Sequence, residues 1–297
     1  MDIKLSYGKK GLDVTLPNHL TTVVSPEFIP GLPDQQGAIK YALRNPIDRS
    51  PLKTSVRSGQ KVAISICDVT RPMPNHIVLP VILSELKHIP DEDITILVAT
   101  GTHRAVTKQE LLSMLGNEIV SREFQIVNHD AFDENTLNFI GETSNGTHVY
   151  LNNIWHESDF RITAGFVEPH FFAGFSGGPK MIAPGLAGFK TIMPLHNSEM
   201  IKHPKSIWGV TKGNPIHDTI REISRMSPAD FSIDVTINKN HDITSVYAGD
   251  MSKVHIAACQ FAKQTAMQKV PHKYDVVITT NSGYPLDMNL YQSVKGM

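Results

Sequence analysis

The feature that most constrains the fold is a repeated alternation of short apolar, β-branched runs with segments of helical character. Such runs lie at 61–68, 93–100, 123–130 and 159–166. Near-continuous apolar runs of this length are typical of strands that a parallel sheet buries on both faces, and helices between them are the usual parallel crossovers. The sequence therefore predicts an α/β fold whose N-terminal domain is built on a parallel sheet.

Two helices are predicted between these strands. The segment 75–87 is mostly apolar and has the character of a helix, although Pro80 lies inside it and removes one backbone donor. The segment 107–115 carries a start signal. Thr107 is a suitable N-cap, and Glu110 stands three residues later, which completes a capping box.

The flanking parts of the chain show other patterns. Residues 1–25 alternate polar and apolar side chains between glycines and prolines, which predicts a β-rich edge at the N-terminus. Strands are predicted at 230–238 and 245–250 around a turn at 238–241, and a helix is predicted at 253–268.

The last residues predict the beginning of a second domain. The run 274–281 has the pattern of another parallel strand, and a helix is expected to begin at Asp287 or Met288. Because that helix would stop soon after it begins, we expect the second domain to be truncated. The predicted domains are an α/β catalytic and cofactor-binding domain at 1–270 and an incomplete α/β domain at 271–297.

Charge and composition exclude several classes of protein. The formal net charge of −1 gives no global attraction to nucleic acid or to anionic membranes. No apolar run approaches the length of a membrane-spanning helix, and the first residues lack the apolar region of a signal peptide. The two cysteines, Cys67 and Cys259, stand far apart, so they form neither a disulfide framework nor a metal-ligand cluster. These features predict a cytoplasmic protein.

Polar or glycine-rich clusters follow four of the predicted strands at their carboxyl ends. They lie at 68–74, 100–104, 165–180 and 281–295. In open α/β sheets, ligands bind outside the carboxyl ends of the strands. Four clusters in these positions predict one shared site.

Asp68, Arg71 and His103 are the candidates in the first two clusters. Asp68 and Arg71 lie three residues apart in a loop stiffened by proline, so a carboxylate and a guanidinium could face the same ligand. Arginine binds a carboxylate through two parallel hydrogen bonds. The alternative is a local Asp–Arg salt bridge that closes the loop. His103 titrates near neutral pH, which suits proton transfer, although a histidine that caps a loop fits equally well.

The segment 165–188 is the densest cluster, with glycine at 165, 174, 177, 178, 185 and 188. Glycine permits a close approach of the backbone to a ligand. The segment contains neither a phosphate-binding P-loop, because Met181 follows Lys180, nor a dinucleotide-binding glycine fingerprint. Its reactive side chains are His170 and Lys180. A lysine here could bind phosphate or form a covalent link to a cofactor; the alternatives are a solvated lysine and a packed histidine.

His196 is a candidate metal ligand. Imidazole is the commonest metal ligand in proteins and suits nickel. No pair or cluster of ligand residues accompanies His196, so a metal here would need donors from elsewhere. The other histidines and both tryptophans are expected to be structural or surface residues: His19, His76, His88, His129, His148, His156, His203, His217, His241, His255, His272, Trp155 and Trp208.

Five separated strings closely resemble the nickel-dependent lactate racemase family. In chain order they are DVTRPMP, GTHR, EPHFFAGFSGGPKMIAPGLAG, LHN and YPLDMNLYQSVKG. The resemblance implies an isomerase that carries a nickel-pincer nucleotide, pyridinium-3-thioamide-5-thiocarboxylic acid mononucleotide. Lys180 matches the lysine that forms a thioamide with this cofactor, and His196 matches the protein ligand of nickel.

The resemblance also implies the residues that handle the substrate. His103 and His170 match the paired acid/base histidines, and Arg71 matches a residue that we interpret as the carboxylate clamp. Asp68, Gln292 and Lys295 match residues that line the site near the cofactor or substrate. Family members continue into a second α/β domain that closes over the site.

The implied reaction is racemisation of a small 2-hydroxy acid. Lactate is the default substrate, while malate and longer acids remain open. One histidine would take the hydroxyl proton as hydride passes to the cofactor, and a planar 2-keto acid would form. Hydride would return to the other face, and the second histidine would reprotonate the oxygen. The implied partners are the proteins that synthesise the cofactor.

Two other functions remain open from the residues alone. A zinc-dependent hydrolase could use His103, His170 and His196 around an activated water. A non-catalytic nucleotide-binding fragment could use the Gly-rich segment only to hold a phosphate.

Overall fold

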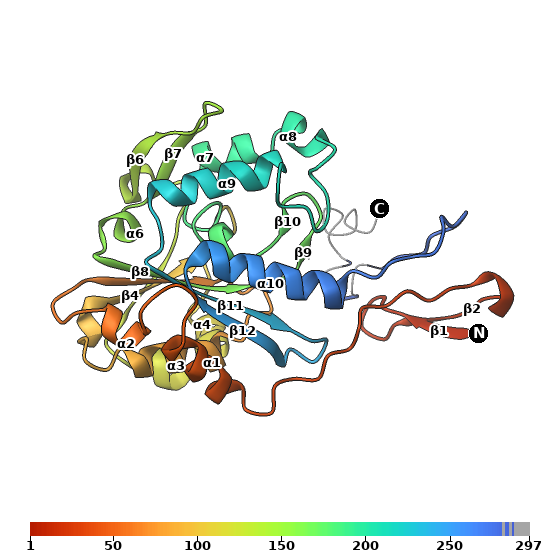
Figure 1. Ribbon diagram of the computed structural model, residues 1–297, viewed down its shortest axis with the longest axis horizontal. Coiled ribbons are helices and arrows are strands. Elements are labelled where there is room, and N and C mark those ends of the chain that lie inside the picture. Colours follow the sequence, from red (N-terminus) through yellow and green to blue (C-terminus); the bar gives the residue numbers. More distant parts are fainter. Residues whose placement is uncertain (281–282, 285–286, 288–297) are drawn as a thin grey trace. The chain divides into compact units, whose positions relative to one another are not determined.

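The structure is a computed structural model that describes residues 1–280, 283–284 and 287 (Figure 1). The chain divides into two compact units. One unit is Phe28–Met267, and the other combines Met1–Glu27 with Gln268–Met297. The domain boundary predicted after residue 270 stays a prediction.

The larger unit is built on a six-stranded sheet with the order β12-β11-β8-β3-β4-β5. Every neighbouring pair is parallel except β11 and β12, which are antiparallel. The predicted α/β fold with a parallel sheet is confirmed. The strands are β3 (Val62–Cys67), β4 (Ile94–Ala99), β5 (Gln125–Asn128), β8 (Phe160–Phe166), β11 (Phe231–Ile237) and β12 (Ile243–Gly249).

Alternating side chains of the strands pack on the two faces of the sheet. Val62, Ile64 and Ile66 of β3 belong to one core cluster, whereas Ala63 belongs to a second. Helices cover both faces (Figure 1). The first face is covered by α1 (Gln35–Arg44), α2 (Leu52–Ser55), α3 (Asn75–Glu85) and α4 (Lys108–Leu115). The second lies under α6 (Asn153–Glu157), α7 (Phe189–Leu195), α8 (Ser198–Lys202), α9 (Pro215–Met226) and α10 (Met251–Ala266).

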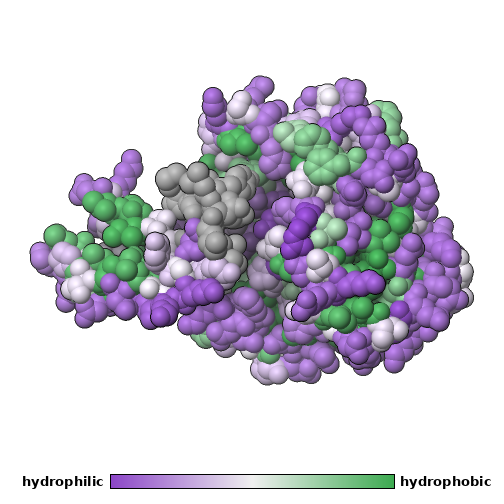
Figure 2. All heavy atoms as spheres, turned by 180° about the vertical axis from the view of Figure 1, so that it is seen from behind, coloured by the Kyte–Doolittle hydropathy of each residue, from purple (hydrophilic) through white to green (hydrophobic). Residues whose placement is uncertain are grey.

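Smaller elements complete the larger unit. The strands β6 (Leu137–Glu142) and β7 (His148–Asn152) form one hairpin, and β9 (Pro169–His170) and β10 (Gly174–Phe175) form another. Short helices lie at α5 (Asn117–Val120), η2 (Asp91–Asp93), η3 (Glu134–Thr136) and η4 (Gly178–Met181). Polar residues cover most of the face drawn in Figure 2, and exposed apolar side chains are scattered among them, which is ordinary for a folded domain.

Both helix predictions between the early strands are confirmed. Helix α3 contains Pro80, as expected. Helix α4 begins at the predicted capping box, in which Thr107 accepts from the amide of Glu110 and Glu110 accepts from the amide of Thr107. Among the described residues, no helix is both long and apolar enough to cross a bilayer.

The N-terminal and C-terminal predictions had different outcomes. Residues 1–25 contain the predicted β-structure, as an antiparallel pair of β1 (Asp2–Leu5) and β2 (Leu12–Thr15) followed by the short helix η1 (Asn18–Leu20). The strand predicted at 274–281 is wrong for its described residues, because 274–280 form no strand. Val276 and Val277 are 77% and 72% exposed there. An apolar run becomes a strand only where a neighbour accepts its hydrogen bonds, and the described residues offer none. The helix predicted from Asp287 or Met288 lies outside the described residues, apart from Asp287.

Candidate active site

The candidate site lies at the carboxyl ends of neighbouring parallel strands. Strand β3 ends at Cys67, which pairs with Ala99 at the end of β4, and β8 lies parallel on the other side of β3. The loops that follow these strands therefore begin at the same edge of the sheet. They carry Asp68, His103 and the segment 165–188.

A buried carboxylate and an imidazole join the first two loops. Nδ1 of His103 lies 2.7 Å from Oδ2 of Asp68, and the hydroxyl of Thr70 donates to Oδ1 at 2.7 Å. The Asp68 side chain is 4% exposed and that of His103 is 48% exposed, so only the histidine is open to a substrate. Because a carboxylate only accepts, Nδ1 of His103 carries the proton in this bond. In the neutral imidazole, Nε2 is then the proton acceptor.

Arg71 is not the side-chain partner of Asp68. Its backbone amide donates to the carbonyl of Asp68 at 3.2 Å, which closes the turn. Within the part of the chain that the structure describes, the Arg71 guanidinium makes no hydrogen bond or ion pair. The local Asp–Arg salt bridge considered from the sequence is therefore wrong.

The residue after His103 anchors its loop to helix α4. Arg104 donates to both carboxylate oxygens of Glu110, at 2.8 and 2.6 Å. The hydrogen bond from Arg104, together with that from Thr107, lowers the pKa of Glu110 to about 2. Glu110 thus serves both the predicted capping box and the His103 loop.

The Gly-rich segment carries Lys180 on the short helix η4 and is tied to the His103 loop through Gly185. The amide of Gly185 donates to the carbonyl of Lys180 at 3.1 Å, and its carbonyl accepts from the amide of Gly101 at 3.0 Å. A Cβ atom at position 185 would lie 2.7 Å from the carbonyl oxygen of Met181, so the contact requires glycine.

A buried carboxyl group lies under the same segment. Asp234 of β11 is fully buried, and its Oδ1 accepts from the amide of Gly178 at 3.0 Å, two residues before Lys180. Its Oδ2 has no hydrogen-bond partner among the described residues. Burial raises the pKa of Asp234 to about 7, although the hydrogen bond from Gly178 opposes the shift.

Two buried histidines hold the segment from its other side. Nδ1 of His217 on α9 donates to the carbonyl of Ala173 at 3.2 Å, and Nε2 of His255 on α10 donates to the carbonyl of Ser176 at 2.9 Å. Their rings stack with centroids 5.4 Å apart. Burial lowers the pKa of His217 to about 3 and that of His255 to about 4, so both are neutral at neutral pH.

His196 follows the C-terminus of α7 in a fixed tautomer. Its Nδ1 donates to the carbonyl of Ile192 at 2.9 Å, which leaves Nε2 as a lone-pair donor of the kind a metal requires. Burial lowers the pKa of His196, the bond to Ile192 opposes this, and the charge of Lys180 lowers the pKa further. Lys180 is therefore within electrostatic range of His196.

One aromatic ring separates His170 from His196. The ring of Phe172 meets His170 edge-on with centroids 4.6 Å apart, and it meets His196 edge-on at 5.3 Å. Nδ1 of His170 accepts from the amide of Ala173 at 3.3 Å. The neutral His170 therefore carries its proton on Nε2, the reverse of His103.

The structure thus brings the predicted residues together in two groups. Asp68 and His103 form the first group, with Arg71 in the same loop, while His170, Lys180 and His196 form the second. Gln292 and Lys295 lie outside the described residues. Within the described residues, no three His, Cys, Asp or Glu side chains converge as a metal site, so His103, His170 and His196 do not form the triad that a zinc hydrolase would need.

The sequence-based prediction missed three supporting residues. Asp234 had a usable signal, because it is an acidic residue in a strand whose other residues are uncharged, and a buried carboxyl group needs a special partner. His217 and His255 had none, since their pairing arises only when α9 and α10 both pack against η4.

Family comparison agrees with this architecture. The lactate racemase N-terminal domain family matches residues 7–209, and the lactate racemase C-terminal domain family matches residues 269–297. The solved lactate racemase apoprotein from Thermoanaerobacterium thermosaccharolyticum superposes with a TM-score of 0.91 at 36% identity. The match covers 99% of this chain and 69% of that one.

Curated relatives give the same result. The chain is 37% identical to the lactate racemase of Thermoanaerobacterium thermosaccharolyticum over all of its own length and 70% of that protein. It is 40% identical to the lactate racemase of Lactiplantibacillus plantarum, over 89% of its own length and 62% of that protein. The chain therefore belongs to the lactate racemase family of isomerases.

Proposed function

We propose that this chain is the catalytic N-terminal part of a racemase for small 2-hydroxy acids, with lactate as the default substrate. The observation that carries the proposal is the His103–Asp68 pair, which leaves Nε2 of His103 as a proton acceptor at the carboxyl ends of the parallel strands. A racemase must remove a proton on one side of the substrate and return one on the other, so it needs one acceptor and one donor at rest.

His103 and His170 are suited to these two roles. With Nδ1 committed to Asp68, the Nε2 atom of His103 would accept the substrate hydroxyl proton. His170 would return a proton to oxygen from its imidazolium form, because the Nε2–H group of the neutral ring whose Nδ1 accepts from Ala173 is far too weak an acid. The roles exchange for the opposite enantiomer. Each positioned acid/base group is expected to contribute about 10²–10⁴-fold to the rate.

Arg71 is the proposed carboxylate clamp. A guanidinium holds a carboxylate through two parallel hydrogen bonds, which fixes the substrate while the neighbouring carbon inverts. The side chain of Arg71 makes no ion pair within the described residues, so this donor pair is not committed to a structural role there. Gln292 and Lys295 are proposed as further residues lining the site.

Lys180 and His196 would hold the nickel-pincer nucleotide. The residues fit this group, because His196 presents Nε2 of a neutral imidazole and belongs to no group of three His, Cys, Asp or Glu side chains that could hold a metal in the described residues. A metal with one protein ligand needs its other donors from a cofactor. When bound, the nucleotide would supply a reversible hydride acceptor, so that the substrate passes through a planar 2-keto acid. The partners proposed are the cofactor-synthesis proteins, and the proposed compartment is the cytoplasm.

Mass spectrometry of the intact protein tests the proposal. The chain is co-expressed with the cofactor-synthesis proteins, and peptides around Lys180 are mapped. An added nucleotide mass on Lys180 together with nickel is expected, and Lys180→Ala is expected to carry neither mass. Lys190→Ala is the matched control, because Lys190 of α7 pairs with Glu134 of η3 and its loss should leave loading intact.

Two results would overturn the proposal. An unmodified Lys180 in the presence of competent synthesis proteins would show that the chain does not carry the cofactor. Bound zinc would then favour a hydrolase. If chiral chromatography shows that the loaded protein leaves L-lactate and other 2-hydroxy acids unchanged, the chain is instead a nucleotide-binding fragment.

A further inference from the structure

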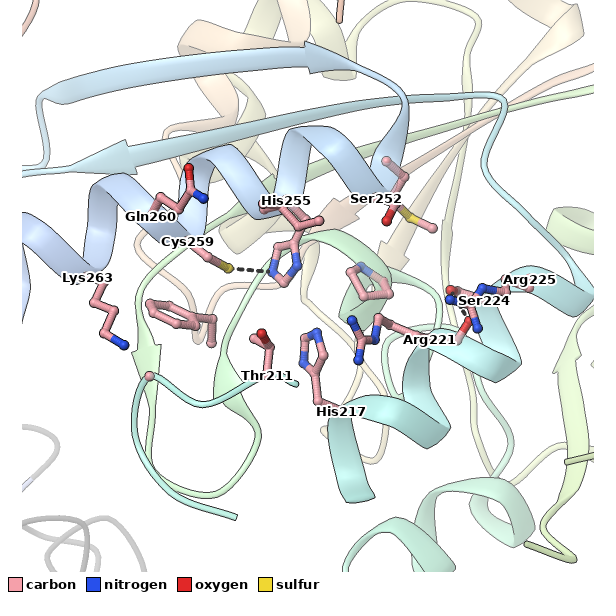
Figure 3. A pocket seen from close by; sticks show the side chains of 15 residues that line it. Thr211, His217, Arg221, Ser224, Arg225, Ser252, His255, Cys259, Gln260 and Lys263 are labelled. Carbon is pink, nitrogen blue, oxygen red and sulfur yellow. Dashed lines mark hydrogen bonds between the residues drawn. The ribbon is translucent and has the colours of Figure 1, made fainter. Parts of the chain in front are cut away.

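A cavity lies between α9 and α10, on the side of the Gly-rich segment that His217 and His255 occupy (Figure 3). Its volume is about 270 Å³, and Phe175 and Pro179 form part of its wall. None of the described residues proposed for catalysis lines it. Ligand pockets for drug-sized molecules span about 300–1,000 Å³, so this cavity suits a smaller molecule.

The charged residues that line the cavity are all cationic. They are Arg221, Arg225 and Lys263, and among the described residues no carboxylate lines it. Arg225 and Lys263 make no ion pair within the described residues. Arg221 pairs with Asp218 on the same helix, but a guanidinium has five N–H donors and keeps several for another partner. The lining therefore favours an anion.

The cavity also offers a hydrogen-bond acceptor, on His217, beside Arg221. Nδ1 of His217 donates to Ala173, so the Nε2 atom of the neutral ring is an acceptor. His217 and Arg221 are four residues apart on α9, so their side chains lie on one helix face, and both are drawn at the cavity in Figure 3. Arg221, His217 and His255 all line the cavity, and the charge of Arg221 helps burial to lower the pKa of both rings.

The rest of the wall divides into polar and apolar parts. Ser224, Ser252 and Gln260 supply neutral hydrogen-bonding groups, while Met251, Ile256 and Cys259 supply apolar surface. A ligand that satisfies every part has a carboxylate for the cation, a hydroxyl for the imidazole acceptor and a short apolar stem.

We propose that the cavity between α9 and α10 is a second, non-catalytic binding site for a small hydroxylated carboxylate. Arg221 binds the carboxylate, and Nε2 of His217 accepts the hydroxyl proton. Pro179 lines the cavity and Lys180 is the next residue, so a bound ligand contacts the segment that carries the proposed cofactor lysine. The site is independent of the proposed function, because it requires neither nickel nor cofactor.

Calorimetric titration of protein made without the cofactor-synthesis proteins tests the site. All variants carry Arg71→Gln, which removes the proposed clamp at the sheet edge. L-lactate is expected to bind, and propionate, which lacks only the hydroxyl, is expected to bind about tenfold more weakly. Arg221→Gln should weaken lactate binding at least about tenfold. Ile256→Trp should abolish it, because Ile256 lines the cavity and is 51% exposed, so a larger ring can be accommodated there and fill the space.

A matched pair of lysines separates a specific site from general attraction. Lys263→Gln and Lys253→Gln each remove one positive charge from α10, but only Lys263 lines the cavity. We expect weaker binding for Lys263→Gln alone. Equal losses in both variants, unchanged binding in Ile256→Trp, equal affinity for propionate, or no lactate binding at millimolar concentration would each overturn the proposal.

Discussion

Asp234 stabilises the turn that precedes Lys180, because its Oδ1 accepts a hydrogen bond from the amide of Gly178 at 3.0 Å. The same carboxyl group is fully buried and leaves Oδ2 without a hydrogen-bond partner among the described residues. A group with this arrangement holds its proton more tightly in the folded chain than in the unfolded chain. Its effect on stability therefore depends on pH.

Asp234→Asn should abolish the loss of folding stability that the Asp234 carboxyl group causes as pH rises. The pKa of Asp234 is about 7 in the folded protein, against an ordinary value of 3.8. Between these values the folded chain binds more protons than the unfolded chain, so the stability from this group is fully present below 3.8 and is lost as pH rises to about 7. In urea unfolding at each pH, the free energy of wild type minus that of the variant should fall over this range. Parallel curves would contradict the assignment.

His255→Gln should make the protein more tolerant of acid. The pKa of His255 is about 4 in the folded protein against an ordinary 6.5, so the unfolded chain takes up the proton first as pH falls. This group's contribution is present above pH 6.5 and is lost as pH falls to about 4. Glutamine can still donate to Ser176, and the variant should lose less stability than wild type over this range. An unchanged acid profile would mean that His255 is not held neutral.

Asp68→Asn should impair proton transfer but leave cofactor loading intact. Without the carboxylate, Nδ1 of His103 loses the partner that fixes its tautomer, and racemisation should fall by about 10²–10⁴-fold. Thr70→Val is the milder control, since it removes one hydrogen bond to Asp68 and leaves the pair with His103. Loss of nickel in Asp68→Asn would instead support a direct role of Asp68 in binding the cofactor.

His196→Ala should lose nickel while Lys180 remains modified. His103→Ala and His170→Ala should stop racemisation and keep the metal. Elemental analysis and peptide mapping on the same samples distinguish these results. If nickel disappears from a His103 or His170 variant instead, the acid/base and ligand assignments are exchanged.

The strands and the capped helix could be predicted because their causes are local. Strand β3 is buried along its whole length, and Thr107 and Glu110 satisfy each other within one turn of α4. The run 274–280 has the same local pattern but no partner strand among the described residues. A strand depends on its neighbours, and a single chain segment does not carry that information.

The residues of the candidate site could be predicted better than the contacts that those residues make with each other. The resemblance identified Asp68 and His103, but not that they bind each other, since the alternative partner Arg71 is nearer in sequence. Helix α9 has the clear apolar face of an amphipathic helix with Ile216, Ile220 and Ile223 buried, yet it was not predicted. The roles of His217 and His255 depend on the packing of α9 and α10 against η4.

The ring of Phe172 has a consequence for how such a site can change. It contacts both His170 and His196, so it couples the position of the proposed proton donor to that of the proposed metal ligand. Moving His170 outward to admit a bulkier acid would also disturb the Phe172 ring that packs edge-on against His196. Room for a different substrate must therefore be made on the Arg71 side of the site. There, no aromatic ring among the described residues contacts two proposed functional side chains at once.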